Sequence, residues 1–171
     1  AFPVYGLGLI ARDSDNQHIK DFVSLKLQDI LTSDNTRYRA VEVVAIVSMS
    51  LLELKGKARD QQVDFLLDYF KNGDNVLVSS HAPEALVLTI RGSEDETHKE
   101  ELALEFMETL KKSSKEKREV QQSCALALGL LGDTDSDEVD KDIRKVLYEI
   151  PKNVSDIQTR AFALIALAHI G

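Results

Sequence analysis

The stretch Val120-Gln-Gln-Ser-Cys-Ala-Leu-Ala-Leu-Gly-Leu-Leu-Gly-Asp133 decides the fold that we expect for this chain of 171 residues. Its apolar residues run almost without interruption from Cys124 to Leu131, and small side chains are interleaved with leucines. A helix of this kind must be covered on more than one side by close neighbours. The stretch therefore predicts a short buried helix that ends at Gly132.

Weaker copies of this stretch recur along the chain. Successive ends lie 45, 36, 40 and 39 residues apart. A period of this length is typical of helical units that are repeated and stacked side by side. The ends fall at Ala11, Gly56, Gly92, Gly132 and Gly171.

Between these copies lie segments whose apolar residues are spaced by three and four positions. Such spacing predicts an amphipathic helix with one buried stripe. We call the buried helices type A and the one-sided helices type B. We expect A helices near residues 2–11, 36–54, 83–91, 120–132 and 159–171, and B helices near residues 19–31, 59–71, 98–112 and 139–150.

Three local features of the chain lead to further expectations. Gly73 is expected to end the second B helix in the left-handed conformation that glycine favours. The segment Val76-Leu-Val78 is expected to be a short extended piece, and Pro151 is expected to end the fourth B helix.

The composition favours an all-α protein, because hydrophobic residues make up 43% of the chain, aromatic residues only 6%, and there are three prolines and no tryptophan. The formal net charge of −8 argues against nucleic acid and anionic membranes as partners. No apolar run approaches the roughly 20 residues of a membrane span, and the start lacks the features of a signal peptide. The localisation is left open. The single cysteine, Cys124, is expected to be a small buried residue.

The stretch 120–133 resembles the A helix of the HEAT-like repeat family. This resemblance implies antiparallel A/B helix pairs stacked into a right-handed α-α superhelix, a solenoid, with the B helices lining its concave face. It implies no shared catalytic residues. The matching positions are Val120, Ala125, Ala127, Leu128, Gly129, Leu131, Gly132 and Asp133, then Arg160, Ala163, Ala166, Leu167, Ile170 and Gly171 at the end of the chain, and Gly6, Leu7, Gly8 and Ile10 at its start.

We therefore expect one repeat domain over residues 1–171, either as a whole protein or as part of a longer array. Its repeats would cover residues 1–35, 36–74, 75–115 and 116–154, with a half repeat at 155–171. An array that begins and finishes with an A helix leaves apolar side chains such as Leu164 and Leu167 uncovered at one flank. Either further repeats of a longer chain or an end-to-end contact with another molecule would cover them.

Acidic residues form rows on two of the expected B helices. Residues four apart lie on one surface of a helix. The rows are Asp64 and Asp68 on the second B helix, and Glu101, Glu105 and Glu108 on the third. They are either an ordinary solvated face or an acidic ridge on the concave surface that receives a basic or polar partner. Lys20, Lys141 and Arg144 are expected to flank the ridge, and the basic segment 111–118 is expected to be a solvated connector.

A second group of carboxylates, Asp133, Asp135 and Asp137, alternates as in the first half of a calcium loop. Such a loop requires a glycine at its sixth position and a glutamate at its twelfth, where Glu138 and Arg144 stand. Capping of the next helix explains the aspartates better than weak metal binding. We expect neither catalytic residues nor a cofactor.

These observations predict a non-enzymatic scaffold for protein–protein interactions. The concave surface of the B helices would bind a protein or peptide. The acidic net charge of the chain favours a basic partner. Two alternatives stay open, an enzyme that resembles the HEAT-like bilin lyases and a purely structural segment of a larger protein. A third, a HEAT-like DNA-repair glycosylase, is disfavoured by the acidic charge and the lack of tryptophan.

Overall fold

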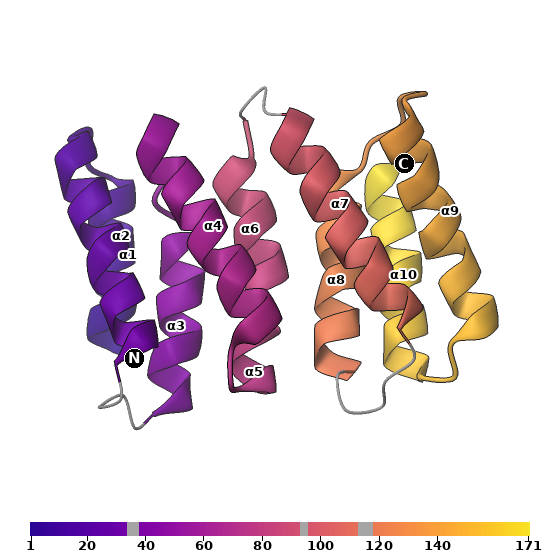
Figure 1. Cartoon of the computed structure of the whole chain (residues 1–171), viewed down its shortest axis with the longest axis horizontal. Helices are drawn as coiled ribbons and strands as arrows, with labels where there is room; N and C mark the ends of the chain where they lie inside the picture. Colours follow the sequence, from indigo (N-terminus) through magenta and orange to yellow (C-terminus); the bar gives the residue numbers. More distant parts are fainter. Residues whose placement is uncertain (34–37, 93–95, 113–117) are drawn as a thin grey trace. The chain divides into compact units, whose positions relative to one another are not determined.

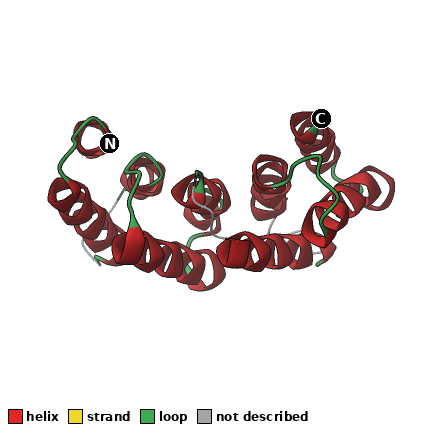
Figure 2. Cartoon of the chain, turned by 90° about the horizontal axis from the view of Figure 1, so that it is seen from above, coloured by secondary structure: helices red, strands yellow, loops and turns green. Residues whose placement is uncertain are grey.

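The structure is a computed structural model that describes residues 1–33, 38–92, 96–112 and 118–171. In these ranges all regular secondary structure is helical, as Figure 2 shows. The prediction of an all-α protein is thus confirmed for the described residues. The centre of the expected basic connector, residues 113–117, lies outside them, as do residues 34–37 at the expected start of the second A helix.

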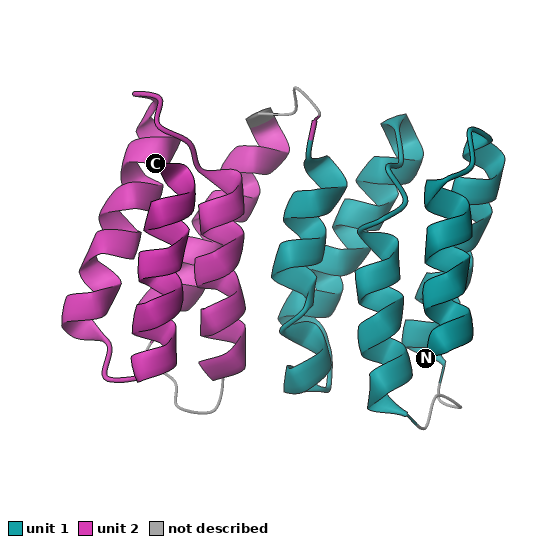
Figure 3. Ribbon diagram, turned by 180° about the vertical axis from the view of Figure 1, so that it is seen from behind, with its two compact units in different colours: residues 1–91 teal, residues 92–171 magenta. Residues whose placement is uncertain are grey.

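The chain divides into two compact units, Ala1–Arg91 and Gly92–Gly171 (Figure 3). The single domain expected over residues 1–171 stays a prediction. The first unit contains α1 (Phe2–Arg12), α2 (Gln17–Thr32), α3 (Arg39–Met49), α4 (Gly56–Asn72), α5 (Val76–Ser79) and α6 (Ala82–Ile90), and the second contains α7 (Glu96–Lys111), α8 (Arg118–Leu131), α9 (Glu138–Asn153) and α10 (Ile157–Ile170) (Figure 1).

In the first unit, α3 lies at the centre and packs against α1, α2 and α6. The helices α1, α3 and α6 form one row, and α2 and α4 form a second row beside it (Figure 1). The apolar stripes of the two rows face each other. The largest fully buried apolar side chains of the first unit are Leu27, Ile46, Met49, Leu66 and Leu86 on these helices and Leu52 in the connection after α3.

In the second unit, α8 packs between α7 and α10, and α9 packs against α10 and α7. The third and fourth B helices bury one apolar stripe each, in which Val139 is only half-buried. The buried residues of the two stripes are Leu102, Ala103, Phe106, Met107 and Leu110 on α7, and Ile143, Val146, Leu147 and Ile150 on α9. The largest fully buried side chains of this unit are Leu102, Phe106, Leu128, Ile143 and Leu147.

A polar network is buried in the first unit around Gln62, whose side chain is almost fully enclosed. Its amide nitrogen donates to the carbonyl of Met49 and to the hydroxyl of Thr89, both at 3.0 Å. Its amide oxygen accepts from Ser24 at 2.8 Å. Because every polar group of this side chain has a partner, the network joins α2, α3, α4 and α6 without leaving a buried amide unsatisfied.

The A-type helices end at a more regular interval than the sequence predicted. Their last residues are 37, 41, 41 and 39 positions apart, and they are Arg12, Met49, Ile90, Leu131 and Ile170.

The prediction that the second A helix extends to Leu54 and ends at Gly56 is wrong. Helix α3 ends at Met49, and Gly56, with a φ of +53°, begins α4. The buried side chains of Leu52 and Leu54 lie in the connection between the two helices. Their burial, and not a helical period, explains why the sequence is apolar there.

Two other local predictions are also wrong, and a third, that Gly73 ends the second B helix, is correct in position but wrong in backbone conformation. Gly73 has a φ of −63°, and a Cβ atom there would lie 2.5 Å from the carbonyl oxygen of Tyr69, so close approach is what requires glycine. Residues Val76–Ser79 form a helical turn, because the Asn75 side chain caps it by accepting from the Leu77 N–H at 3.1 Å. Pro151 lies inside α9, where the bond from the Val154 N–H to the Ile150 carbonyl, 3.0 Å long, completes the last turn.

Glycine lets two A helices approach closely in the second unit. A Cβ atom built on Gly129 of α8 would lie 2.5 Å from Cα of Ala166 in α10. Such a distance is not tolerated, so these two backbones are in direct contact. Gly6 of α1 is the opposite case, since a Cβ atom there would meet nothing within 4 Å.

These two glycines give a matched pair of substitutions. Gly129→Ala should destabilise the fold by about 1–3 kcal/mol, because the added methyl group forces α8 and α10 apart. Gly6→Ala should stabilise it by about 0.5–1 kcal/mol, since alanine loses less backbone entropy in a helix. Urea melts followed by circular dichroism measure both. Equal effects of the two substitutions would contradict the close helix contact.

Candidate interaction surface

The structure places the acidic rows on helices in both units. Asp64 and Asp68 lie on α4 of the first unit, and both are exposed. On α7 of the second unit, Glu101 and Glu108 are exposed and Glu105 is half-buried. Each row is therefore on the surface as predicted. Whether the two rows form one ridge stays a prediction, because they belong to different units.

Asp64 lines a hollow between α2 and α4 with a volume of about 330 Å³. Asp21, which is held by a 2.9 Å hydrogen bond from the Gln17 side chain, lies on its α2 side. Leu25 also lines the hollow and is 57% exposed. The hollow thus combines two carboxylates with an exposed aliphatic side chain.

Asp68 lines a second hollow, of about 470 Å³, at the C-terminal ends of the same two helices. Glu42 of α3 and Asp74 contribute further carboxylates, and Tyr69 lies beside them. Burial raises the pKa of Tyr69, and the negative charges of Glu42 and Asp74 raise it further. The negative charges that line this hollow therefore contribute to the raised pKa of Tyr69.

Neither hollow has a lysine or arginine among the described residues that line it. Five carboxylates line the two hollows together. A surface of this kind has a negative potential that attracts cations and basic segments. We call the two hollows together the acidic groove; its carboxylates are Asp21, Glu42, Asp64, Asp68 and Asp74.

Sequence reasoning found Asp64 and Asp68 but missed the other three members of the acidic groove. The two that it found are four residues apart on one helix, a spacing that is visible in the sequence. Asp21 and Glu42 come from the neighbouring helices α2 and α3, so only helix packing brings them to this place. No local pattern identifies them.

Whether Lys20, Lys141 and Arg144 flank such a ridge stays a prediction, but all three side chains make contacts within the chain. Lys20 is buried and lies 3.8 Å from the carboxylate of Glu53. Arg144 donates to the backbone carbonyls of Asp133 and Asp135, to the latter at 2.7 Å. Lys141 lies 3.4 Å from Glu138 on its own helix. Lys20 and Arg144 are thus engaged in structural contacts.

The aspartate-rich turn between α8 and α9 caps the second of these helices. Asp137 is the N-cap of α9 and accepts from the Asp140 N–H at 2.7 Å. The preceding carboxylates repeat this local pattern, since Asp133 accepts from the Asp135 N–H and Asp135 from the Asp137 N–H. The capping role is confirmed for Asp137.

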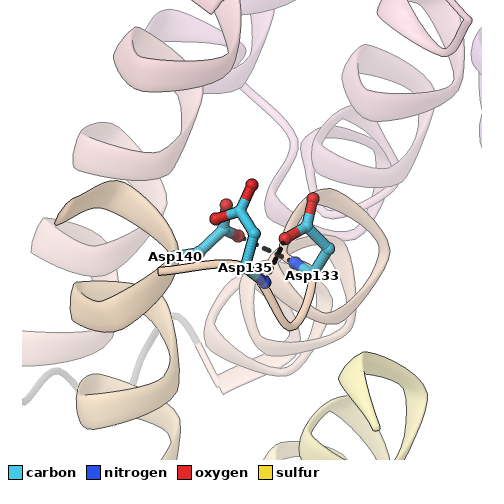
Figure 4. Close-up of side chains that lie close together, drawn as sticks. All are labelled: Asp133, Asp135 and Asp140. Carbon is cyan, nitrogen blue, oxygen red and sulfur yellow. Dashed lines mark hydrogen bonds between the residues drawn. The ribbon is translucent and has the colours of Figure 1, made fainter. Parts of the chain in front are cut away.

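Three carboxylates of this region, Asp133, Asp135 and Asp140, have oxygens within 4.8 Å of one another (Figure 4). The ammonium group of Lys99 on α7 lies among them, 2.9 Å from Asp140 and 3.8 Å from both Asp133 and Asp137. Asp140 is fully buried and also accepts from the Asp133 N–H at 2.7 Å. A positive charge from the chain itself therefore compensates part of the negative charge here. We call Lys99 with Asp133, Asp135, Asp137 and Asp140 the lysine–aspartate cluster.

The pKa values in the lysine–aspartate cluster reflect this arrangement. Burial raises the pKa of Asp140, against the opposing effect of Lys99. Burial also works to lower the pKa of Lys99, but the hydrogen bond to Asp140 and the surrounding negative charges outweigh it and raise this pKa. The hydrogen bond from the Asp140 N–H lowers the pKa of Asp137. The cluster is thus an ionic contact between α7 and α9.

Cys124 is fully buried in α8, and burial raises the pKa of its thiol far above the usual range. The thiolate is the reactive form of cysteine, so this residue is chemically inert at neutral pH. It acts as a small core side chain, as the sequence predicted.

Comparison of the chain with models of protein families, with characterised proteins and with solved structures finds no match. None of the helices in the described parts of the chain combines the length and apolar character of a membrane span. The class that the structure establishes is therefore an all-α protein, and its function has to be argued from the surface.

Proposed function

We propose that this chain is a HEAT-like α-helical repeat protein that acts as a scaffold for protein–protein interactions. Three observations support the proposal: the alternation of A and B helices, the interval of about 40 residues between the ends of the A helices, and the close approach of α8 and α10 at Gly129. Within each unit, consecutive A helices pack against one another, α1 against α3 and α3 against α6 in the first and α8 against α10 in the second, as in stacked repeats. The solenoid form of the array is part of this proposal.

The partner would be a basic segment of another protein, bound on the B-helix side of the first unit. The single observation that carries this assignment is the acidic groove between α2 and α4, which has five carboxylates and no lysine or arginine among its described lining residues. Lysine and arginine side chains also have aliphatic stems that pack on apolar surface. Leu25, more than half exposed in the same hollow as Asp21 and Asp64, offers such a surface.

The test is binding of a fluorescent lysine-rich peptide to the whole chain, measured by anisotropy at low ionic strength. We expect the double variant Asp21→Lys/Asp64→Lys to weaken binding by roughly tenfold or more, because two attractive contacts become repulsive. Asp64 is exposed, whereas Asp21 is half-buried and loses one hydrogen bond from Gln17. The substitutions should therefore leave the circular dichroism spectrum almost unchanged and lower the urea midpoint only slightly.

The matched control is Asp13→Lys/Asp15→Lys, which changes the net charge by the same amount at exposed residues outside the acidic groove. If the control weakens binding as much as the groove variant, the peptide responds only to net charge and the groove is not the site. Charge reversal at Glu101, Glu105 and Glu108 tests the row on α7 in the same assay. A loss confined to that variant would move the site to the second unit.

A further inference from the structure

The dipeptide Asn72-Gly73 ends helix α4 inside the acidic groove. Asn72 is the last residue of the helix, its side chain is exposed, and it lines the same hollow as Asp68 and Asp74. It is the only asparagine of the chain that precedes a glycine. Because glycine has no side chain and moves freely, its backbone nitrogen reaches a preceding asparagine side chain more easily than that of any other residue. Asn72 is therefore the asparagine that is most prone to spontaneous deamidation.

The reaction needs no enzyme, and water is its only other reactant. The backbone nitrogen of Gly73 attacks Cγ of Asn72 and forms a C–N bond, the Cγ–Nδ2 bond breaks, and ammonia leaves with the proton that the Gly73 nitrogen gives up. Water then opens the five-membered succinimide ring at one of its two carbonyl carbons. One opening gives aspartate at position 72 and the other isoaspartate. Both products carry a carboxylate that the asparagine lacked.

Two hydrogen bonds restrain the reacting groups in the folded chain. The N–H of Gly73 donates to the carbonyl of Tyr69 at 2.9 Å, so the proton that has to leave this nitrogen is engaged. The Nδ2 amide of Asn72 donates to Oδ1 of Asp68 at 2.8 Å, which holds the side chain against the preceding turn. Both bonds belong to the last turn of α4, and helix ends open locally at a small cost in free energy. The reaction thus requires this turn to open, and not the whole unit.

The fold itself requires the glycine that makes this site reactive. A Cβ atom at position 73 would lie 2.5 Å from the carbonyl oxygen of Tyr69 and 3.2 Å from Cε1 of its ring. Real Cβ atoms do not approach a backbone oxygen this closely, so no other residue fits here without a shift of the turn. The contact that closes the end of α4 therefore also leaves Asn72 beside a residue that does not block the attack.

We propose that Asn72 is a deamidation site controlled by the opening of the last turn of α4, and that its product adds a sixth carboxylate to the acidic groove. The new charge lies four residues from Asp68 and at a helix C-terminus, where a negative charge is unfavourable. Deamidation therefore loosens the end of α4 and strengthens the attraction of the groove for a basic segment. The second effect rests on the proposed function, whereas the reaction does not.

The reaction is measured on the whole chain, incubated at pH 7 with and without concentrated guanidinium chloride. Trypsin then releases residues 72–91 as one peptide, and mass spectrometry detects the replacement of NH by O and assigns its position. We expect conversion at Asn72 in both samples, roughly tenfold or more slowly in the folded chain, because only the opened turn reacts. Asn75, which precedes valine in the same peptide, is the internal control and should convert far more slowly.

Asp68→Ala tests the control by the helix end, because it removes the acceptor of the Asn72 amide and leaves Gly73 in place. It should speed the conversion in the folded chain by roughly threefold or more and leave the rate in guanidinium chloride unchanged. Asp64→Ala is the matched control, since it removes an exposed carboxylate one turn earlier on the same helix. An Asp68 variant that reacts no faster than this control would contradict the role of the last turn.

The consequence for the groove is tested with Asn72→Asp in the peptide-binding assay. We expect it to bind the lysine-rich peptide roughly two- to threefold more tightly than the parent chain. Asn153→Asp, at an exposed position of the second unit, adds the same charge elsewhere and should have less effect. Conversion at Asn72 without tighter binding would contradict the role of the groove. Equal rates in the folded and denatured chains, or no conversion in the folded chain, would overturn the controlled site itself.

Discussion

Replacing Leu128 with alanine is expected to destabilise the fold by about 2–5 kcal/mol. Leu128 is fully buried at the centre of α8, the helix that packs between α7 and α10. The substitution removes three carbon atoms of a fully buried side chain, together with their packing contacts. It leaves a cavity that the neighbouring helices cannot fill without moving. A urea melt followed by circular dichroism measures the loss.

The same helix provides the controls for this prediction. Leu130 is 43% exposed, so Leu130→Ala should change the free energy of unfolding by less than about 0.5 kcal/mol. Ala127 is fully buried, and Ala127→Phe should destabilise by about 1–3 kcal/mol or more through overpacking. Similar small effects at Leu128 and Leu130 would show that α8 is not an internal helix.

Lys99→Met is expected to destabilise the fold by about 2–4 kcal/mol, although it removes only one partly exposed lysine. The reason is Asp140, which is fully buried and loses the ammonium group 2.9 Å away. The remaining aspartates of the cluster then repel one another without a central positive charge. The effect is measured as the shift of the urea midpoint at pH 7.

The pH dependence of this effect follows from the sign of the pKa shift. Burial already raises the pKa of Asp140, and the loss of Lys99 raises it further. In the variant, folding therefore becomes less favourable as the pH rises above the ordinary aspartate pKa of about 3.9, where the unfolded chain ionises first. The difference between the variant and the parent chain should shrink as the pH falls toward that value.

A second substitution, Asp140→Asn, distinguishes the effect of the Lys99 charge on stability from the effect of its packing. An asparagine oxygen can still accept from the Asp133 N–H, but it carries no charge. The double variant Lys99→Met/Asp140→Asn should be more stable than Lys99→Met alone at pH 7. A double variant that is no more stable would mean that the lysine acts through its aliphatic stem and not through its charge.

The all-α character and the interval of the helices could be predicted from the sequence because both depend on local patterns. Apolar spacing identified the A and B helices, and the small residues near Gly129 identified a helix that is covered closely. The errors fell in connections such as residues 50–55, where buried leucines lie outside a helix. A buried segment carries apolar residues whether or not its backbone is helical. The spacing of apolar residues therefore does not distinguish the end of a buried helix from a buried connection.

The sequence by itself thus determined that the chain is helical, which faces of its helices are apolar, and that Asp64 and Asp68 share a surface. Only the tertiary structure decided that Asp21 and Glu42 join them in the acidic groove, and that Lys99 meets Asp140, 41 positions away. The physical reason is the distance along the chain over which each effect acts. Helical periodicity relates residues within a few turns of one chain segment, whereas charges on different helices meet only when packing brings those helices together.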